Sequence, residues 1–276
     1  MPVQSLAKKI PILMYHSISD QATPAYRPFA VPPALFAQQM EYLHQQNYTP
    51  LTVTQFMEIR AAGKQTLPAK PVLLTFDDGL EDFYTGAFPL LRRYGFPATL
   101  YVVTGFMHKT SRWLKEDGEG ERPMMTWEQL ATVQAGGIEC GGHTHSHPQL
   151  DTMPFTQARA EIVLCKKLLE EHLGRKVSSF AYPYGYHTAA MKQAVRAAGY
   201  TSACAVKYEM CSEITDPFAL KRLLVGPATD IPALSALLDT KHTSALTGIY
   251  KSARVPVWRM VRRAKAPASR PLPEQL

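Results

Sequence analysis

Three histidines stand at alternate positions in the stretch ECGGHTHSHPQL, residues 139–150. Imidazole nitrogens combined with one carboxylate oxygen bind a borderline divalent cation such as Zn²⁺, Co²⁺ or Ni²⁺. His143 and His147 are four residues apart, so a helical turn after Gly142 would place them on one face and direct His145 elsewhere. In an extended segment all three would share one side. The proline that follows favours the turn, and a histidine-rich surface loop is the alternative.

A pair of adjacent carboxylates could supply the rest of such a site. Asp77 and Asp78 stand in TFDDG, directly after an apolar run. Two neighbouring negative charges raise the pKa of one carboxyl unless a cation stands between them. A cation site on a neighbouring strand end, such as the histidine segment could provide, would therefore favour a functional role for the pair. An ordinary Asp-Gly turn, with Asp78 capping the next helix, is the alternative.

Apolar, β-rich runs alternate along the chain with amphipathic stretches, which is typical of parallel strands joined by helices. The expected strands are IPILMY, PVLLTF, ATLYVV, GIEC, SSFAY, YTSACAV and ALKRLLV. Helices are expected over residues 33–46, 81–94, 126–137, 155–174 and 188–198, with a last short one from residue 230. This pattern predicts an α/β fold, a deformed (β/α) barrel of about seven parallel strands with helices outside.

The residues capable of chemistry follow the predicted strands. In a barrel of this kind, functional groups lie at the C-terminal ends of the strands. Four strand ends carry such groups: His16, Asp77 with Asp78, His143 with His147, and Tyr184. The sequence therefore predicts that these side chains meet at one face of the barrel.

Three of these segments resemble a known family. TFDDG at 75–79, HTHSH at 143–147 and AYPYG at 181–185 are similar, in order and spacing, to the first three motifs of the polysaccharide deacetylases, carbohydrate esterase family four. The resemblance covers roughly residues 10 to 230. It implies that Asp77 is the catalytic base and that Asp78, His143 and His147 bind the metal. It also implies that Thr144 braces the histidine loop.

The third motif and the general acid depart from the usual pattern of the family. Tyr184 matches the residue whose backbone N–H helps to bind the oxyanion, but Ala181 stands where the family has an arginine that orients the base. Arg222 is the candidate to hold Asp77 instead. The late histidine that serves as general acid is not evident, whereas His16 follows the first strand. This arrangement is similar to the permuted branch of exopolysaccharide poly-β-1,6-N-acetylglucosamine deacetylases.

The resemblance implies a metal-dependent carbohydrate N-deacetylase, a hydrolase acting on linear amide C–N bonds in exopolysaccharide biosynthesis. The expected cofactor is Zn²⁺, with Co²⁺ or Ni²⁺ as alternatives, because such an ion lowers the pKa of water to about 7 and polarises a carbonyl. Asp77 would then take the water proton, and the Tyr184 N–H would stabilise the oxyanion. A protonated His16 would donate to the departing amine, giving a free amino sugar and acetate.

Three other functions compete with this prediction. Two histidines and one carboxylate also form the facial triad of non-haem Fe(II) oxygenases, although those enzymes need no second adjacent carboxylate. Because the motif arginine is missing, the chain could be an inactive carbohydrate-binding relative. The same scaffold could also hydrolyse another amide, such as a formyl group or a cyclic imide.

The expected partner is an N-acetylated glycan or a lipid-linked sugar. Trp127, Tyr182 and Tyr186 could stack on sugar faces, as amphipathic rings do. The long polar segment 107–125 could cover the site as a lid, or be disordered. The four cysteines show no short paired spacing and are expected to be buried thiols.

The charge of the chain is concentrated near its C-terminus. Residues 251–270 hold seven of the cations, so that most of the net charge of +7 lies there. We therefore divide the chain into a catalytic domain at 1–245 and a basic, partly disordered tail at 246–276. A charge confined to a tail disfavours nucleic acid as a partner. The tail also contains Trp258 and Val257, a mixture that can contact an anionic membrane surface.

The N-terminus lacks the pattern of a signal peptide, and the apolar runs are too short to cross a bilayer. We therefore expect a cytoplasmic protein, with the inner membrane face as the place where the tail makes contact.

Overall fold

The computed structural model describes residues 9–63 and 67–239, so the predicted tail at 246–276 lies outside the described residues. In that part of the chain, parallel strands form one curved sheet in the order β10–β9–β8–β7–β6–β2–β12, and β5 also pairs with β6. The strands are β2 (Ile12–Tyr15), β5 (Thr49–Leu51), β6 (Pro71–Phe76), β7 (Ala98–Val102), β8 (Ile138–Gly142), β9 (Ser179–Ala181), β10 (Ser202–Cys204) and β12 (Leu223–Leu224).

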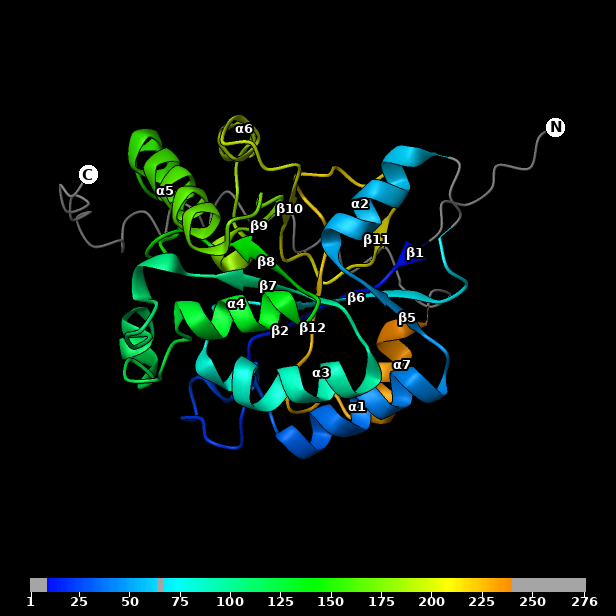
Figure 1. The fold of residues 1–276 in the computed structure, drawn as a ribbon. Coiled ribbons are helices and arrows are strands. Elements are labelled where there is room, and N and C mark those ends of the chain that lie inside the picture. Colours follow the sequence, from blue (N-terminus) through cyan, green and yellow to red (C-terminus); the bar gives the residue numbers. More distant parts are fainter. Residues whose placement is uncertain (1–8, 64–66, 240–276) are drawn as a thin grey trace.

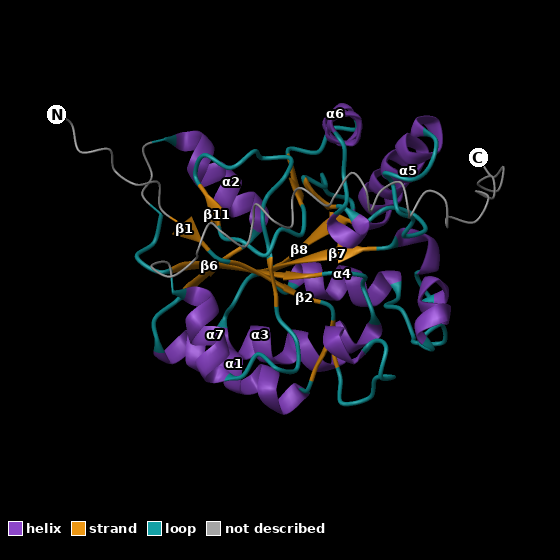
Figure 2. Ribbon diagram, turned by 180° about the vertical axis from the view of Figure 1, so that it is seen from behind, coloured by secondary structure: helices purple, strands orange, loops and turns teal. Residues whose placement is uncertain are grey.

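The helices lie outside this sheet, as Figures 1 and 2 show from opposite sides. Helices α1, α3 and α7 cover one flank, while α2, α5 and α6 lie on the other. Their bounds are α1 (Pro33–Gln45), α2 (Val53–Ala62), α3 (Phe88–Tyr94), α4 (Trp127–Ala135), α5 (Phe155–Leu173), α6 (Ala189–Ala197) and α7 (Ile231–Leu238). The predicted deformed (β/α) barrel with external helices is therefore confirmed.

The ends of several helices follow from single residues. Thr126 and Gln129 form the predicted capping box at the start of α4, each bonding the backbone N–H of the other. Gly174 ends α5 in the left-handed conformation at φ 62°, which glycine adopts without steric cost. The helix predicted over 81–94 is instead divided into a π-helical turn, η2 (Phe83–Ala87), and α3.

In the main sheet and the α-helices around it, the sequence prediction missed β5 and α2. A second capping box, made by Thr52 and Gln55, begins α2. The backbone N–H of Val53 donates to Thr99 Oγ1 on β7 at 3.0 Å, and that of Thr54 donates to Glu139 on β8 at 3.0 Å. The start of α2 is thus fixed to two strands of the barrel.

The remaining short elements complete the barrel ends. An isolated bridge between Cys204 and Leu220 links β10 to the chain just before β12. Two small sheets pair β1 (Lys9–Ile10) with β11 (Cys211–Ser212) and β3 (Ser17–Ile18) with β4 (Ala30–Val31).

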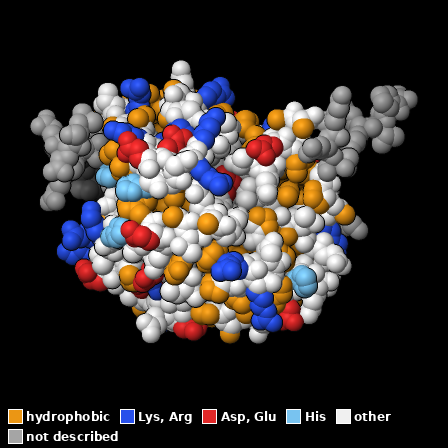
Figure 3. Space-filling view, in the orientation of Figure 1, with side chains coloured by type: hydrophobic (Ala, Val, Ile, Leu, Met, Phe, Trp, Pro, Cys, Tyr) orange, Lys and Arg blue, Asp and Glu red, His pale blue; other side chains and the backbone are white. Residues whose placement is uncertain are grey.

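Most strand residues are buried, and they form the core together with the inner faces of the helices. All four cysteines are free and buried, as predicted. Among the described helices, none is both long and apolar enough to span a membrane. On the face shown in Figure 3, basic and acidic side chains are interspersed with apolar ones.

Candidate active site

The fold brings Asp78, His143 and His147 together at the C-terminal ends of β6 and β8. Asp78 Oδ1 lies 3.3 Å from His147 Nε2 and 3.6 Å from His143 Nε2. All three side chains are buried, and one ligand atom from each lies within 4.8 Å of the others. One carboxylate oxygen and two imidazole nitrogens are a donor set that suits a divalent cation.

The histidines converge through a backbone turn that is not helical, contrary to the predicted helical turn. Thr144 and His147 both adopt positive φ angles, 69° and 59°, which are uncommon for residues other than glycine. The Thr144 hydroxyl accepts a hydrogen bond from the His147 backbone N–H at 3.0 Å. His145 points away from the cluster, and its Nδ1 lies 3.1 Å from Thr104 Oγ1.

The charge state of the cluster also fits a cation. Asp78 Oδ1 is buried and has no hydrogen-bond partner among the described residues. Burial, together with the neighbouring Asp77, raises the pKa of Asp78 well above its usual range. Burial lowers the pKa of both His143 and His147, which keeps the imidazoles neutral as metal ligands must be. The residues present therefore fit a divalent metal.

Asp77 is held by Arg222, the residue that the sequence offered in place of the missing motif arginine. Arg222 NH1 and NH2 donate to the two carboxylate oxygens of Asp77 at 2.6 and 2.8 Å. Both side chains are buried. Burial alone would raise the pKa of Asp77, but Arg222, together with His143 and His16, holds that pKa below the usual range. The second carboxylate is thus ionised and fixed in orientation.

Ala181, which replaces the motif arginine, has a different contact with the site. His143 Nδ1 lies 2.8 Å from the Ala181 carbonyl oxygen. Since a carbonyl can only accept, this bond places the proton on Nδ1 and leaves Nε2 free to face Asp78. The backbone at position 181 therefore orients a metal ligand.

His16 lies at the end of β2, near Asp77 and Arg222. Its ring lies 5.1 Å from that of Phe29, and its Nδ1 is buried without a hydrogen-bond partner in the described chain. Burial lowers the pKa of His16 to about 4, although the Asp77 charge opposes this shift. With this lowered pKa, His16 must gain a proton before it can donate one, and its role as general acid stays a prediction.

Two aromatic side chains flank His147. Tyr184 lies in the short helix η5 (Pro183–Gly185) with φ 58°, and its ring centre is 4.9 Å from that of His147. Trp113, in η4 (Arg112–Asp117), lies 5.2 Å from the same ring. The sequence prediction missed Trp113, whose one signal was an aromatic residue in a long polar segment after a strand.

The residues predicted to stack on sugars are dispersed. Tyr182 is fully buried and its hydroxyl donates to the Phe218 carbonyl at 3.1 Å, so its predicted sugar contact is wrong. Trp127 stacks on His172 at 3.9 Å between ring centres, which covers one face of the indole. Tyr186 is half-buried directly after η5, and its contact with a sugar stays a prediction.

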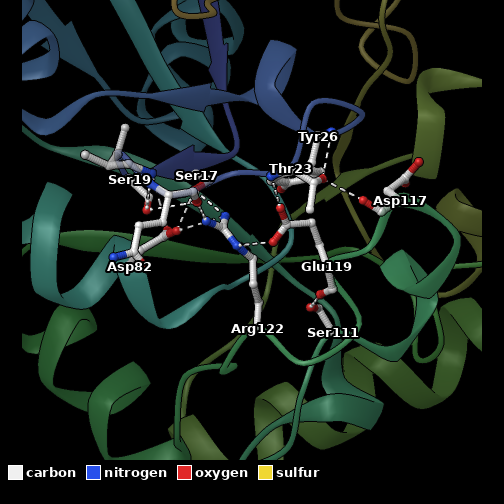
Figure 4. Close-up of polar contacts among 11 residues, drawn as sticks. Ser17, Ser19, Thr23, Tyr26, Asp82, Ser111, Asp117, Glu119 and Arg122 are labelled. Carbon is white, nitrogen blue, oxygen red and sulfur yellow. Dashed lines mark hydrogen bonds and ion pairs between the residues drawn. The ribbon is translucent and has the colours of Figure 1, made fainter.

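The segment 107–125 is folded against the site, where Trp113 contacts His147. Arg122 holds the segment in place through ion pairs and a hydrogen bond. Arg122 donates from Nε to Glu119 at 2.9 Å and from NH1 to Ser17 Oγ at 2.6 Å. It also lies 3.5 Å from Asp82. Figure 4 shows its guanidinium between Asp82 and Ser17 on one side and Glu119 on the other. A cavity of about 530 Å³ adjoins this cluster, lined by both polar and apolar residues, among them Asp82, Arg122 and Leu80.

Comparison with known proteins decides the family. The family model described as "Polysaccharide deacetylase" matches residues 64–203, a stretch that contains both aspartates, both histidines and Tyr184. The chain belongs to the polysaccharide deacetylase family. The predicted resemblance is confirmed, and the chain is a hydrolase of that family with a candidate Asp-His-His metal site.

Sequence relatives place the chain near two groups of this family. The Bacillus subtilis polysaccharide deacetylase relative YxkH is 28% identical over 84% of this chain and 77% of its own length. The poly-β-1,6-N-acetyl-D-glucosamine N-deacetylase of Staphylococcus aureus is 23% identical over 72% of this chain and 68% of its own length. The Escherichia coli protein of that name is 30% identical, but the match covers only 49% of this chain and 20% of that protein.

Solved structures share the fold over most of the chain. The Streptococcus pyogenes deacetylase PplD, solved with acetate, superposes with a TM-score of 0.73 at 26% identity, covering 85% of this chain and all of that one. IcaB from Ammonifex degensii gives a TM-score of 0.71 at 27% identity, covering 83% of this chain and 97% of that one.

Proposed function

We propose that this deacetylase-family protein hydrolyses the N-acetyl group of an amino sugar in a glycan or lipid-linked saccharide, releasing acetate and a free amine. The observation that carries this proposal is the buried Asp77–Arg222 ion pair beside the Asp78, His143 and His147 cluster. It supplies an ionised, oriented base next to a site for a Lewis acid. Relatives named as N-acetylglucosamine deacetylases, and one deacetylase solved with acetate, support the same chemistry.

The protein's own groups divide the reaction between them. Asp78, His143 and His147 would hold a divalent cation, which supplies Lewis acidity for water and for the amide carbonyl. Asp77, kept ionised by Arg222, accepts the proton of the attacking water. The Tyr184 backbone N–H donates to the developing oxyanion. His16, neutral at rest, takes up a proton and then passes it to the departing amine.

Two features favour an active enzyme over a carbohydrate-binding relative. The inactive alternative was based on the missing motif arginine, but Arg222, which directly precedes β12, pairs with Asp77 instead. In addition, a binding module would gain nothing from burying Asp77 and Asp78 side by side, because each buried charge costs free energy unless it is compensated.

The test is acetate release from N-acetylglucosamine oligomers and from lipid-linked sugar extracts. Protein stripped by a chelator would be restored with Zn²⁺, Co²⁺ or Ni²⁺, and Asp77→Asn would serve as the inactive control. Metal-dependent release that disappears in Asp77→Asn supports the proposal and ranks the substrates. Metal binding without acetate from any of them would contradict it and direct the search to other amides, such as formyl groups.

We further propose that the basic residues at 251–270 bring the enzyme to an anionic membrane surface on the cytoplasmic side. This proposal is based on the sequence alone, on seven cations among apolar residues. Flotation with anionic liposomes would compare the full chain with a chain ending at residue 250. The full chain should float and the shortened one should not; if both stay in solution, the proposal fails.

A further inference from the structure

Glu161 of α5 lies under the loop that carries the metal histidines. Its side chain is 2% exposed, although a carboxylate is rarely buried so deeply without compensating partners. In the described chain, the hydrogen bonds that Glu161 accepts come from that loop. Its Oε2 accepts from the backbone N–H groups of His145 and Ser146, both at 2.8 Å, and its Oε1 accepts from the Ser146 hydroxyl at 2.6 Å.

These bonds lie between the two histidine ligands in sequence. The loop must turn sharply for His143 and His147 to face Asp78, and it does so with left-handed backbone at Thr144 and His147. Such conformations are unfavourable for residues with a Cβ, and they persist where surrounding contacts determine them. Hydrogen bonds to a charged acceptor are among the strongest contacts available for that purpose.

We propose that Glu161 is a positioning residue of the metal site, which holds the 143–147 loop in the conformation that lets both histidines bind one cation. The hydrogen bonds of Glu161 reach His145 and Ser146, so it acts on both histidines through the backbone between them. The proposal rests on the metal site of the proposed function and extends it by one residue. Removing the carboxylate would loosen the loop and weaken binding without removing any ligand.

The same helix offers a matched control. Glu170, nine residues further along α5, also accepts a backbone N–H from a following loop, that of Val177 at 2.9 Å, and it pairs with Lys166 at 2.7 Å. Glu170→Gln therefore removes a carboxylate that also bonds a backbone N–H after α5, but the loop that it bonds contains Val177 and not the histidines. Glu170 is partly exposed whereas Glu161 is buried, so a merely structural role for Glu161 would lower thermal stability more than Glu170→Gln does but would leave metal affinity and the Co²⁺ spectrum unchanged.

The experiment measures metal binding to the full-length protein. Chelator-stripped wild type, Glu161→Gln, Glu161→Asp and Glu170→Gln would be titrated with Co²⁺ and Zn²⁺, recording dissociation constants and the Co²⁺ absorption spectrum, with thermal unfolding measured on the metal-free forms. We expect Glu161→Gln to bind about 10- to 100-fold more weakly, the range typical of outer-shell partners, with an altered spectrum. Glu170→Gln should keep the wild-type dissociation constant and spectrum even where its thermal stability falls.

Glu161→Asp keeps the charge but is one methylene shorter, so it should fall between wild type and Glu161→Gln. Unchanged Co²⁺ affinity and spectrum in Glu161→Gln would overturn the proposal. If Glu161→Gln does not fold, Glu161→Asp provides the test. A wild-type dissociation constant in Glu161→Asp would overturn the proposal, and weaker metal binding would support it. The readout is metal binding rather than acetate release, so the proposed reaction can fail while this inference stands; a wild type that binds no metal overturns both.

Discussion

Arg222 donates two hydrogen bonds to Asp77, although 145 residues separate them in the sequence. Arg222 Nε also donates to the Ala205 carbonyl at 3.2 Å, and its NH1 lies 3.3 Å from Thr75 Oγ1. The guanidinium is therefore held by two strands at once, by β6 with the residue that follows it and by the residue that follows β10. This fixed position allows a residue outside the family's usual motif to orient the Asp77 carboxylate.

Replacing Arg222 by Gln should destabilise the protein by about 3–5 kcal/mol and abolish most activity, because Asp77 would be left as an unpaired buried charge. Urea unfolding measures the stability. In the double variant with Asp77→Asn the loss should be smaller than the sum of the single losses. Lys192→Gln, which breaks a partly exposed ion pair with Asp216, is the control and should cost about 1 kcal/mol or less. If Arg222→Gln and Lys192→Gln lowered the free energy of unfolding equally, the buried ion pair would be no more important than the exposed one.

Asp78→Asn should stabilise the metal-free protein at neutral pH while removing metal binding. The buried carboxylate lacks a hydrogen-bond partner at Oδ1 among the described residues, and relieving such a group is worth about 1–3 kcal/mol. Thermal unfolding after dialysis against a chelator measures the effect. A lower stability in Asp78→Asn would show that the carboxylate is compensated in another way.

The stabilisation of the metal-free protein by Asp78→Asn should depend on pH. The folded-state pKa of Asp78 is raised above its unfolded value of about 3.9, so the folded protein binds the extra proton between the two values. Wild-type stability from this group is therefore lost as pH rises through the folded pKa. The advantage of Asp78→Asn over wild type should be largest at neutral pH and vanish near pH 4. A gain that stays constant from pH 4 to 8 would disprove this assignment.

His145→Ala should retain metal, whereas His143→Ala and His147→Ala should lose it. The His145 ring faces Thr104 rather than Asp78, so its removal should weaken binding at most about tenfold, the lower end for outer-shell partners. Equilibrium dialysis followed by elemental analysis gives the metal content of each variant. Loss of metal in His145→Ala comparable to that in His143→Ala would contradict the site as described.

Gly185→Ala should displace η5 and reduce turnover through the neighbouring Tyr184 N–H. A Cβ at Gly185 would meet the Cβ and backbone nitrogen of Val206 at 2.5 Å, in addition to a φ of 74°. Gly174→Ala is the matched control, since its φ of 62° is similar but nothing lies within 4 Å of the added carbon. The control should lose only the left-handed strain of about 1–2 kcal/mol and keep its kcat. Equal kcat values in both variants would refute the role of η5.

The architecture, and the strand ends at which most candidate site residues lie, could be predicted from the sequence. Alternating apolar runs and amphipathic stretches require parallel strands with external helices, and the carboxyl ends of parallel strands meet at one edge. Asp78 could therefore be predicted to converge with His143 and His147, because TFDDG and HTHSH each lie at the end of a predicted strand. The ends of α4 and α5 were also predictable, since Thr126 and Gly174 act on their own backbone neighbourhood.

Which side chains contact one another could be seen only in the folded structure. Tyr182 and Tyr184 are two residues apart, yet the first is buried with its hydroxyl bonded to the Phe218 carbonyl and the second flanks His147. Between them the chain enters η5, where Tyr184 has a left-handed backbone. Trp113 and Glu161 reach the site from a loop and from a helix that carry no motif. The charge state of His16 was likewise undetermined, since it depends on how completely its neighbours exclude water. Helices, strands and their ends depend mainly on the local sequence. The burial of side chains and their pairing between distant segments depend on how the whole chain packs.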